Sequence, residues 1–304
     1  MRPDDNPVVV WGMPAAHFCL GQHQSAAAEL VEQSRIPVIR RPLGGGGVWL
    51  DRNQACVVMV APRNFFPVRP DAWYAHALAP VLQVYREMNW PVKLVRQDIW
   101  LDGKKLAGSG AASIAEAGLV GSSFLLKFPA AEFARLIDTP SDGFRLWLIE
   151  ALQSSVTSWS EHASVPDPAW LSLVYRRAAA GVFGWRWEQS LLRDDERAAA
   201  DDYRSELLPD RDGRARHVPY GIKIRARHYL TEREFDGASL RVLTRDQAIE
   251  RLALSELPQL PERVLADEPA TQSVLSAALQ TYLPADKATL WAQRILATAY
   301  FEES

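Results

Sequence analysis

Cysteine, long apolar runs and surplus positive charge are all scarce in this 304-residue chain. The two cysteines, Cys19 and Cys56, lie in apolar stretches, which argues against a disulfide scaffold and favours a reducing compartment. No apolar stretch reaches the roughly 20 residues of a membrane-spanning helix, and the first six residues have no apolar signal region. The net charge of −3 indicates no general affinity for nucleic acid. We therefore expect a cytoplasmic protein without membrane or nucleic-acid partners.

Several catalytic signatures are also missing. The glycine run at residues 44–47 is not followed by the Gly-Lys-Ser/Thr of a Walker loop, and no Rossmann spacing occurs. No GxSxG serine is present, and both thiols lie in apolar surroundings, where cysteine is usually inert. We predict no metal site held by the protein, because metal-ligand spacing is absent among the six histidines His17, His23, His76, His162, His217 and His228.

What the chain does contain is ample material for a core, with 48% hydrophobic and 23% charged residues. Its length predicts one large or two medium domains. Strand-like runs with short connections, mixed with a few helices, predict an α+β domain with a mixed, largely antiparallel sheet. From about residue 166 helical patterns increase, and a charged stretch at 209–214 reads as a linker. We place the domain boundary so that residues 1–190 and 191–304 form separate domains.

The apolar patterns predict the individual elements. Strands are expected at residues 8–11, 17–20, 36–41, 55–61, 92–95, 98–101, 119–128, 222–229 and 239–243. Helices are expected at residues 25–33, 70–89, 130–137, 143–152, 169–183, 191–208, 274–283 and 290–300. The dipeptide Asp102-Gly103 predicts a tight hairpin turn.

The stretch from Arg40 to Trp49 contains two arginines and then, after Pro42 and Leu43, four consecutive glycines. Glycine allows positive φ and close approach to a ligand. Successive N–H groups of such a loop can hold an anion, and a neighbouring guanidinium can add bidentate contacts. A plain flexible hairpin explains the composition equally well, so both interpretations stay open from the residues alone.

A second motif, Asp102 to Gly110, carries two adjacent lysines before two glycines. A lysine on a strand can supply a fixed positive charge to a phosphate or an acyl carbonyl. Strand alternation puts Lys104 and Lys105 on opposite faces. We expect Lys104, next to the turn, to be solvated, whereas Lys105 can have either a solvated or a site role. Gly108 and Gly110 would leave room for a ligand beside the strand.

Three motifs in order resemble those of the lipoate–protein ligase family, within the wider biotin/lipoate ligase superfamily. Arg40–Asp51 resembles its RRxxGGGxVxxD loop, and Leu20–Gln24 resembles its IGRxQ turn. Gln97-Asp98-Ile99 followed by Asp102–Ser109 resembles its N-D-hydrophobic segment and (G/D)xKxxGS lysine strand. The resemblance runs from about residue 8 to residue 137, and is only in outline beyond.

Two neighbouring branches of the superfamily fit less well. Biotin–protein ligases have a similar lysine strand, but their loop is of the GRGRxGR type, which this chain lacks. Octanoyltransferases use a cysteine beyond the lysine strand, and here no cysteine follows Cys56.

The resemblance implies a catalytic domain of the biotin/lipoate ligase type at residues 1–190 and a smaller C-terminal α/β accessory domain at 191–304. It implies that lipoate, or a similar medium-chain acid, reacts with ATP and Mg²⁺ to an acyl-adenylate. The acyl group then passes to a lysine of a lipoyl carrier, such as a glycine-cleavage H-like protein or a 2-oxoacid dehydrogenase E2 domain.

The same resemblance assigns roles to residues. Lys105 would be catalytic, and the glycine loop with Arg41 would hold the adenylate phosphate. Val48, Cys56 and Phe124 would be candidates for an alkyl tunnel. The implied substrate- and nucleotide-binding residues are Arg40, Arg41, Gly44, Gly45, Gly46, Gly47, Val48, Cys56, Gln97, Asp98, Gly108, Gly121, Ser122 and Ser123.

The chain departs from the family pattern in four places. Leu43 stands where Ser or Thr is frequent, Leu50 where a histidine is frequent, and Ala112 where an arginine is usual, while Gly121-Ser122-Ser123 replaces His-Gly-Thr. Ala112 and Gly121 favour a second hypothesis, a non-catalytic acyl- or carrier-binding relative, whereas the retained Arg41, Gly44–Gly47 and Lys105 favour the ligase. A third hypothesis is ATP-independent acyl transfer between carriers, against which the missing late cysteine counts.

Overall fold

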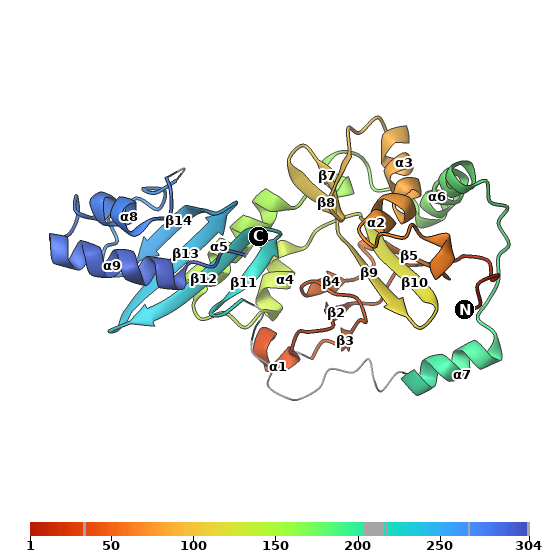
Figure 1. Cartoon of the computed structure of the whole chain (residues 1–304), viewed down its shortest axis with the longest axis horizontal. Coiled ribbons are helices and arrows are strands. Elements are labelled where there is room, and N and C mark those ends of the chain that lie inside the picture. The colour runs from red at the N-terminus through yellow and green to blue at the C-terminus, as the bar shows by residue number, and fades with distance from the viewer. Residues whose placement is uncertain (33–34, 204–215, 217, 267, 303–304) are drawn as a thin grey trace. The chain divides into compact units, whose positions relative to one another are not determined.

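The computed structural model describes the chain except residues 33–34, 204–215, 217, 267 and 303–304. It contains two compact units (Figure 1). The first comprises residues 1–26, 33–129 and 153–211, and the second comprises residues 27–32, 130–152 and 212–304. The chain therefore passes between the units several times, and a domain boundary between residues 190 and 191 stays a prediction.

The main sheet of the first unit has four antiparallel strands in the order β1-β5-β10-β9. These are β1 (Val8–Gly12), β5 (Gln54–Pro62), β10 (Ala117–Leu125) and β9 (Ser109–Ile114). The central strand β5 alternates, so that Ala55, Val57 and Met59 enter the hydrophobic core.

Two three-stranded sheets complete the β-structure of this unit. One has the order β3-β2-β4, formed by β3 (Val38–Arg40), β2 (His17–Leu20) and β4 (Val48–Leu50). Its β2–β3 pair is parallel and its β2–β4 pair antiparallel. The other is an antiparallel meander of β6 (Lys93–Val95), β7 (Asp98–Leu101) and β8 (Lys104–Ala107). The first of these small sheets carries the glycine loop, between β3 and β4.

Helices α2 (Ala72–Ala77), α3 (Ala79–Glu87) and α6 (Pro168–Phe183) bury apolar faces in the same core. The single helix expected at residues 70–89 is wrong, because the chain forms two helices there. Pro80 lies at the start of α3, where its missing N–H is tolerated. The other helical segments described in the first unit are η1 (Arg63–Phe65), η2 (Trp159–Glu161) and α7 (Asp194–Tyr203). The expected linker at 209–214 lies outside the described residues.

The second unit is built on an antiparallel meander of β11 (Gly221–Arg225), β12 (His228–Phe235), β13 (Ala238–Arg245) and β14 (Ala248–Leu254). Helices α8 (Gln272–Leu279) and α9 (Ala285–Thr298) share a core with β13 and β14 (Figure 1). Residues of α1 (Ala26–Glu29), α4 (Ala130–Leu136) and most of α5 (Asp142–Ser155) also belong to this unit.

One strand prediction in this unit is wrong. The strand expected at residues 222–229 is a hairpin, because Arg227 adopts a φ of 58° and ends β11 before β12 begins. Neither glycine nor asparagine marks this turn, so the usual sequence signal is missing. Strand β14 was not predicted at all.

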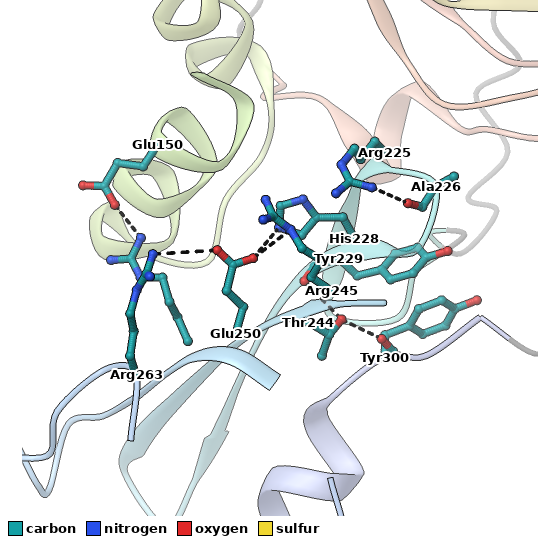
Figure 2. A network of polar contacts seen from close by, with 11 residues as sticks. Glu150, Arg225, Ala226, His228, Tyr229, Thr244, Arg245, Glu250, Arg263 and Tyr300 are labelled. Atoms are coloured by element: carbon teal, nitrogen blue, oxygen red, sulfur yellow. Dashed lines mark hydrogen bonds and ion pairs between the residues drawn. The ribbon is translucent and has the colours of Figure 1, made fainter. Parts of the chain in front are cut away.

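A network of charged side chains lies on the meander of the second unit (Figure 2). Glu250 Oε2 lies 3.0 Å from Arg245 Nε and 3.5 Å from Nε2 of the fully buried His228, while Glu250 Oε1 lies 3.9 Å from Arg263. Burial, followed by the charges of Arg245 and Arg225, lowers the pKa of His228 to about 3. The imidazole is therefore neutral at physiological pH.

The predicted fold class is confirmed, since the structure is α+β with mixed, largely antiparallel sheets. Within the described part of the chain, no helix is both long and apolar enough to cross a membrane.

Candidate active site

The lysine hairpin separates its two lysines. Asp102 and Gly103 form the predicted turn with φ values of 49° and 78°. Lys104 Nζ donates a hydrogen bond to the carbonyl of Gln153 at 3.0 Å, so it has a backbone partner rather than water alone. Lys105 does not share these contacts, as strand alternation predicted.

Lys105 and Asp98 form the charged end of the candidate site. Their Nζ and Oδ2 atoms lie 3.0 Å apart, with the aspartate side chain 9% and the lysine side chain 28% exposed. A Cβ built on Gly108 would lie 3.0 Å from Lys105 Nζ, so the lysine itself uses the space beside that glycine. The backbone N–H of Thr157 donates to the Lys105 carbonyl at 2.9 Å and fixes the strand. The result is a positioned, partly exposed cation that an anionic group can approach.

Two serine hydroxyls connect the segments around this charged end. Ser109 Oγ donates to the carbonyl of Gln97, and Ser122 Oγ donates to the carbonyl of Gly108 at 3.0 Å. These bonds fasten the chain after the lysine strand to its neighbours. A direct ligand role for Gln97 and Ser122 stays a prediction.

The Arg41 guanidinium stabilises the glycine loop by hydrogen bonds to its backbone carbonyls. Its Nη2 donates to the carbonyls of Gly44 at 2.9 Å and Gly46 at 2.7 Å, and its Nη1 donates to the carbonyl of Cys19 at 2.9 Å. Gly45 adopts a φ of 93°, the conformation that favours glycine. In this structure Arg41 therefore organises the loop, and its contact with a phosphate stays a prediction.

The turn at Gly21 and the glycine loop support each other although they are distant in sequence. A Cβ on Gly21 would lie only 2.0 Å from the Gly45 carbonyl oxygen, so only glycine allows this approach. Arg40 donates to the carbonyls of Gln22, at 3.1 Å, and Gln24. The arginine pair thus has two structural tasks, since Arg40 fixes the turn and Arg41 fixes the loop.

One face of the main sheet presents small and apolar residues toward this loop. Strand alternation and register place on it Cys56, Val58, Gly110, Ala112, Gly121 and Ser123. Ser123 Oγ donates to Gln54 Oε1 at 3.1 Å. The side chain of Leu43 packs against Gly110 and Gly121, where added Cβ atoms would lie 3.2 and 3.3 Å from it. This face is the apolar continuation of the charged end at Lys105.

The expected tunnel residues do not all lie together. Cys56 is on the apolar face and half-buried, whereas Val48 is 39% exposed on β4. Phe124 alternates to the opposite face of β10 and packs in the core between Tyr85 and Tyr175, with ring centroids 5.3 and 6.3 Å away. Phe124 is therefore a core residue rather than a wall of the site.

The two thiols differ in their electrostatic surroundings. Burial raises the pKa of Cys19, but its hydrogen bond with His17 and the Arg41 charge, 3.8 Å from Sγ, outweigh that effect and lower the pKa. Burial raises the pKa of Cys56 to about 11. Cys19 is therefore the thiol whose thiolate form is favoured, which its place in an apolar run did not indicate.

The structure thus brings the separate motifs to one region of the first unit. Gly110 was expected to leave room for a ligand, whereas Leu43 and Val58 were not predicted as site residues. The glycine spacing does not reveal which side chain faces Gly110 or which strand lies beside it. No group of three or more His, Cys, Asp and Glu residues that could hold a metal occurs among the residues the structure describes.

The segment that contains these motifs is matched by a family model. The lipoyl protein ligase A/B catalytic domain matches residues 2–170, which is more than half of the chain. The chain belongs to this family. No curated protein matches it.

Solved structures of ligases share the fold at low identity. A bi-partite lipoate protein ligase from Thermoplasma acidophilum, described with its E2 lipoyl domain, is 15% identical with a TM-score of 0.62, covering 68% of this chain and 82% of that one. A lipoate-protein ligase A bound with ATP is 15% identical with a TM-score of 0.57, covering 68% and 84%. LipL1 from P. falciparum, in complex with lipoate, is 13% identical with a TM-score of 0.53, covering 95% and 88%. At this identity the likeness shows the fold of this ligase-family chain.

Proposed function

We propose that this protein is an ATP-dependent lipoate–protein ligase. The position of Lys105 is the observation that carries the proposal. Its Nζ lies 3.0 Å from Asp98 Oδ2, which fixes the ammonium beside an apolar face. A charged end next to an apolar surface fits a carboxylic acid with an alkyl tail. Membership of the ligase family and relatives bound to ATP and to lipoate support the same substrates.

The reaction has two steps. A carboxylate oxygen of the acid attacks the α-phosphorus of ATP, so that an acyl–phosphate bond forms and pyrophosphate leaves. The amine of a carrier lysine then attacks the acyl carbonyl, an amide bond forms, and AMP leaves with the bonding electron pair. Lys105 stabilises the negative charge that grows on the phosphate and carbonyl oxygens. The loop organised by Arg41 presents its N–H groups to the nucleotide phosphate.

Mg²⁺ bound to ATP would neutralise phosphate charge. Such an ion keeps most of its ligands as phosphate oxygens and water, with one or two carboxylates from the protein. Asp98 is the carboxylate beside Lys105 and can supply one oxygen. This fits a site without three clustered metal ligands in the described residues.

The carrier is a lipoyl domain or protein. The T. acidophilum relative was solved as part of a lipoylation system with an E2 lipoyl domain. The deciding experiment is lipoate-dependent exchange of labelled pyrophosphate into ATP, followed by mass spectrometry of a lipoyl domain incubated with the enzyme. Exchange plus a lipoyl-sized mass increase is expected. Folded protein that binds lipoate without exchange contradicts activation.

A non-catalytic binding relative is the second candidate function. Ala112 and Gly121 on the apolar sheet face, and Leu43 packed against that face, favour it, as does the use of Arg41 by loop carbonyls. Binding of the acid or of the carrier without exchange would support it. Transfer through a thioester is the third candidate, and Cys19 is the thiol to inspect. A hydroxylamine-sensitive acyl adduct on Cys19 during turnover would favour transfer over ligation.

A further inference from the structure

Leu43 connects the glycine loop with the main sheet. A Cβ built on Gly110 would lie 3.2 Å from Leu43 Cβ and 3.5 Å from its Cδ1, and a Cβ built on Gly121 would lie 3.3 Å from the same Cδ1. Gly110 and Gly121 are register partners on β9 and β10. The leucine side chain therefore fills the space left by two missing side chains on neighbouring strands.

This filled space adjoins the charged end of the site. Gly108, under the ammonium of Lys105, precedes Gly110 by two residues, about 7 Å along an extended chain. On the other side Val58 Cγ2 lies 3.7 Å from a Cβ built on Gly121. The surface therefore changes from ionic at Lys105 to apolar at Leu43 and Val58.

We propose that Leu43 sets the length of the acyl chain that the site accepts. The inference rests on the proposed acid-activating function. With the carboxylate at Lys105, an alkyl tail that runs over the apolar face ends against the side chain that occupies the Gly110–Gly121 space. A shorter residue at position 43 frees the volume of about three carbons, and each further methylene buried there should raise affinity roughly fourfold.

The test is a chain-length profile. Pyrophosphate exchange is measured with saturated acids of increasing length for wild type, Leu43→Ala and Leu50→Ala. We expect the Leu43→Ala optimum to move to acids about two or three methylenes longer, with roughly a 15- to 60-fold relative gain for those acids. Leu50→Ala removes the same atoms from the strand after the loop and should keep the wild-type profile.

Refilling the space supplies a second, independent variant. Gly121→Ala in the Leu43→Ala background should return the optimum toward shorter acids, because its new methyl group lies 3.3 Å from the position that Leu43 Cδ1 leaves and narrows the freed space. A purely structural role of Leu43 predicts lower stability of all variants without this reversal. An unchanged profile in folded Leu43→Ala, or no reversal on refilling, overturns the proposal.

Failure of the proposed ligase function can be distinguished from failure of the proposal for Leu43. Absence of exchange in wild type with every acid contradicts the ligase assignment. The same profile is therefore also measured as direct acid binding by calorimetry. That measurement decides the role of Leu43 whether or not exchange occurs.

Discussion

Lys105 extends directly over Gly108, so closely that one added methyl group would meet its ammonium nitrogen at 3.0 Å. The glycine therefore determines where the cation lies, and Asp98 holds it there. The space beside Gly108, which the sequence suggested was left for a ligand, is occupied in this structure by the side chain of Lys105. This relationship makes the lysine the first target for mutation.

Lys105→Ala should lose most acyl transfer while its melting temperature stays close to wild type. The reason is that a preorganised donor acts on charge that develops in the transition state, and its removal costs a rate factor of roughly a hundred to a thousand. Lys104→Ala is the matched control, since its Nζ bonds the Gln153 carbonyl instead. Rates are measured by lipoyl transfer to a carrier. Equal, small effects of both substitutions would exclude a catalytic Lys105.

Gly45→Val should abolish ligand binding with a modest effect on folding. A β-branched residue is strained at a φ of 93°, and its Cβ would lie 3.3 Å from Arg41 Nη2, which orders the loop. Gly181→Val, in helix α6 and outside the loop, is the control, because nothing lies within 4 Å of a Cβ there. Binding of lipoate and ATP is measured by calorimetry. Wild-type affinity in Gly45→Val would show that the loop conformation is unimportant for binding.

The two thiols should titrate at different pH. Arg41 and His17 favour the Cys19 thiolate, whereas burial raises the pKa of Cys56 to about 11. In molecules whose glycine loop opens transiently, alkylation should therefore label Cys19 at a lower pH than Cys56. Arg41→Gln should raise the pH at which Cys19 reacts. Mass spectrometry of each peptide across a pH series measures this. Earlier labelling of Cys56, which is the more exposed thiol, would show that access rather than thiolate character controls reaction.

His228 should make the second unit sensitive to acid (Figure 2). Its folded pKa of about 3 lies below the ordinary value of 6.5, so the folded state binds fewer protons than the unfolded state. Above pH 6.5 the neutral imidazole does not reduce the free energy of unfolding. As the pH falls from 6.5 toward 3, protonation of the unfolded state lowers that free energy. By pH 4.5 the loss in unfolding free energy is about 2–3 kcal/mol.

Urea unfolding of wild type and His228→Gln between pH 7.5 and pH 4.5 tests this, with pH chosen to span the titration. Because His228 is fully buried, its replacement also changes stability at neutral pH, so the slopes against pH are compared rather than absolute values. A shallower decline in the variant is expected. Parallel curves would mean that His228 does not titrate on unfolding in this range.

Several features follow from local residue preferences and could therefore be predicted from the sequence alone. Asp102-Gly103 specified the hairpin turn because these residues tolerate positive φ, and alternation then placed Lys104 and Lys105 on opposite faces. The ordered motifs around Arg41 and Lys105 indicated the family. These signals are short in range, so they can be read without knowing which strands meet.

The tertiary structure decided what those residues touch. Arg41 reaches the Cys19 carbonyl, and Leu43 lies on Gly110 and Gly121, through contacts between segments far apart in the sequence. Glycine spacing alone cannot reveal which side chain fills the space that it leaves. The turn at Arg227 was missed for a related reason, since a positive φ at arginine is imposed by the packing of the strands around it. Contacts of this kind depend on register between strands, which local sequence preferences do not encode.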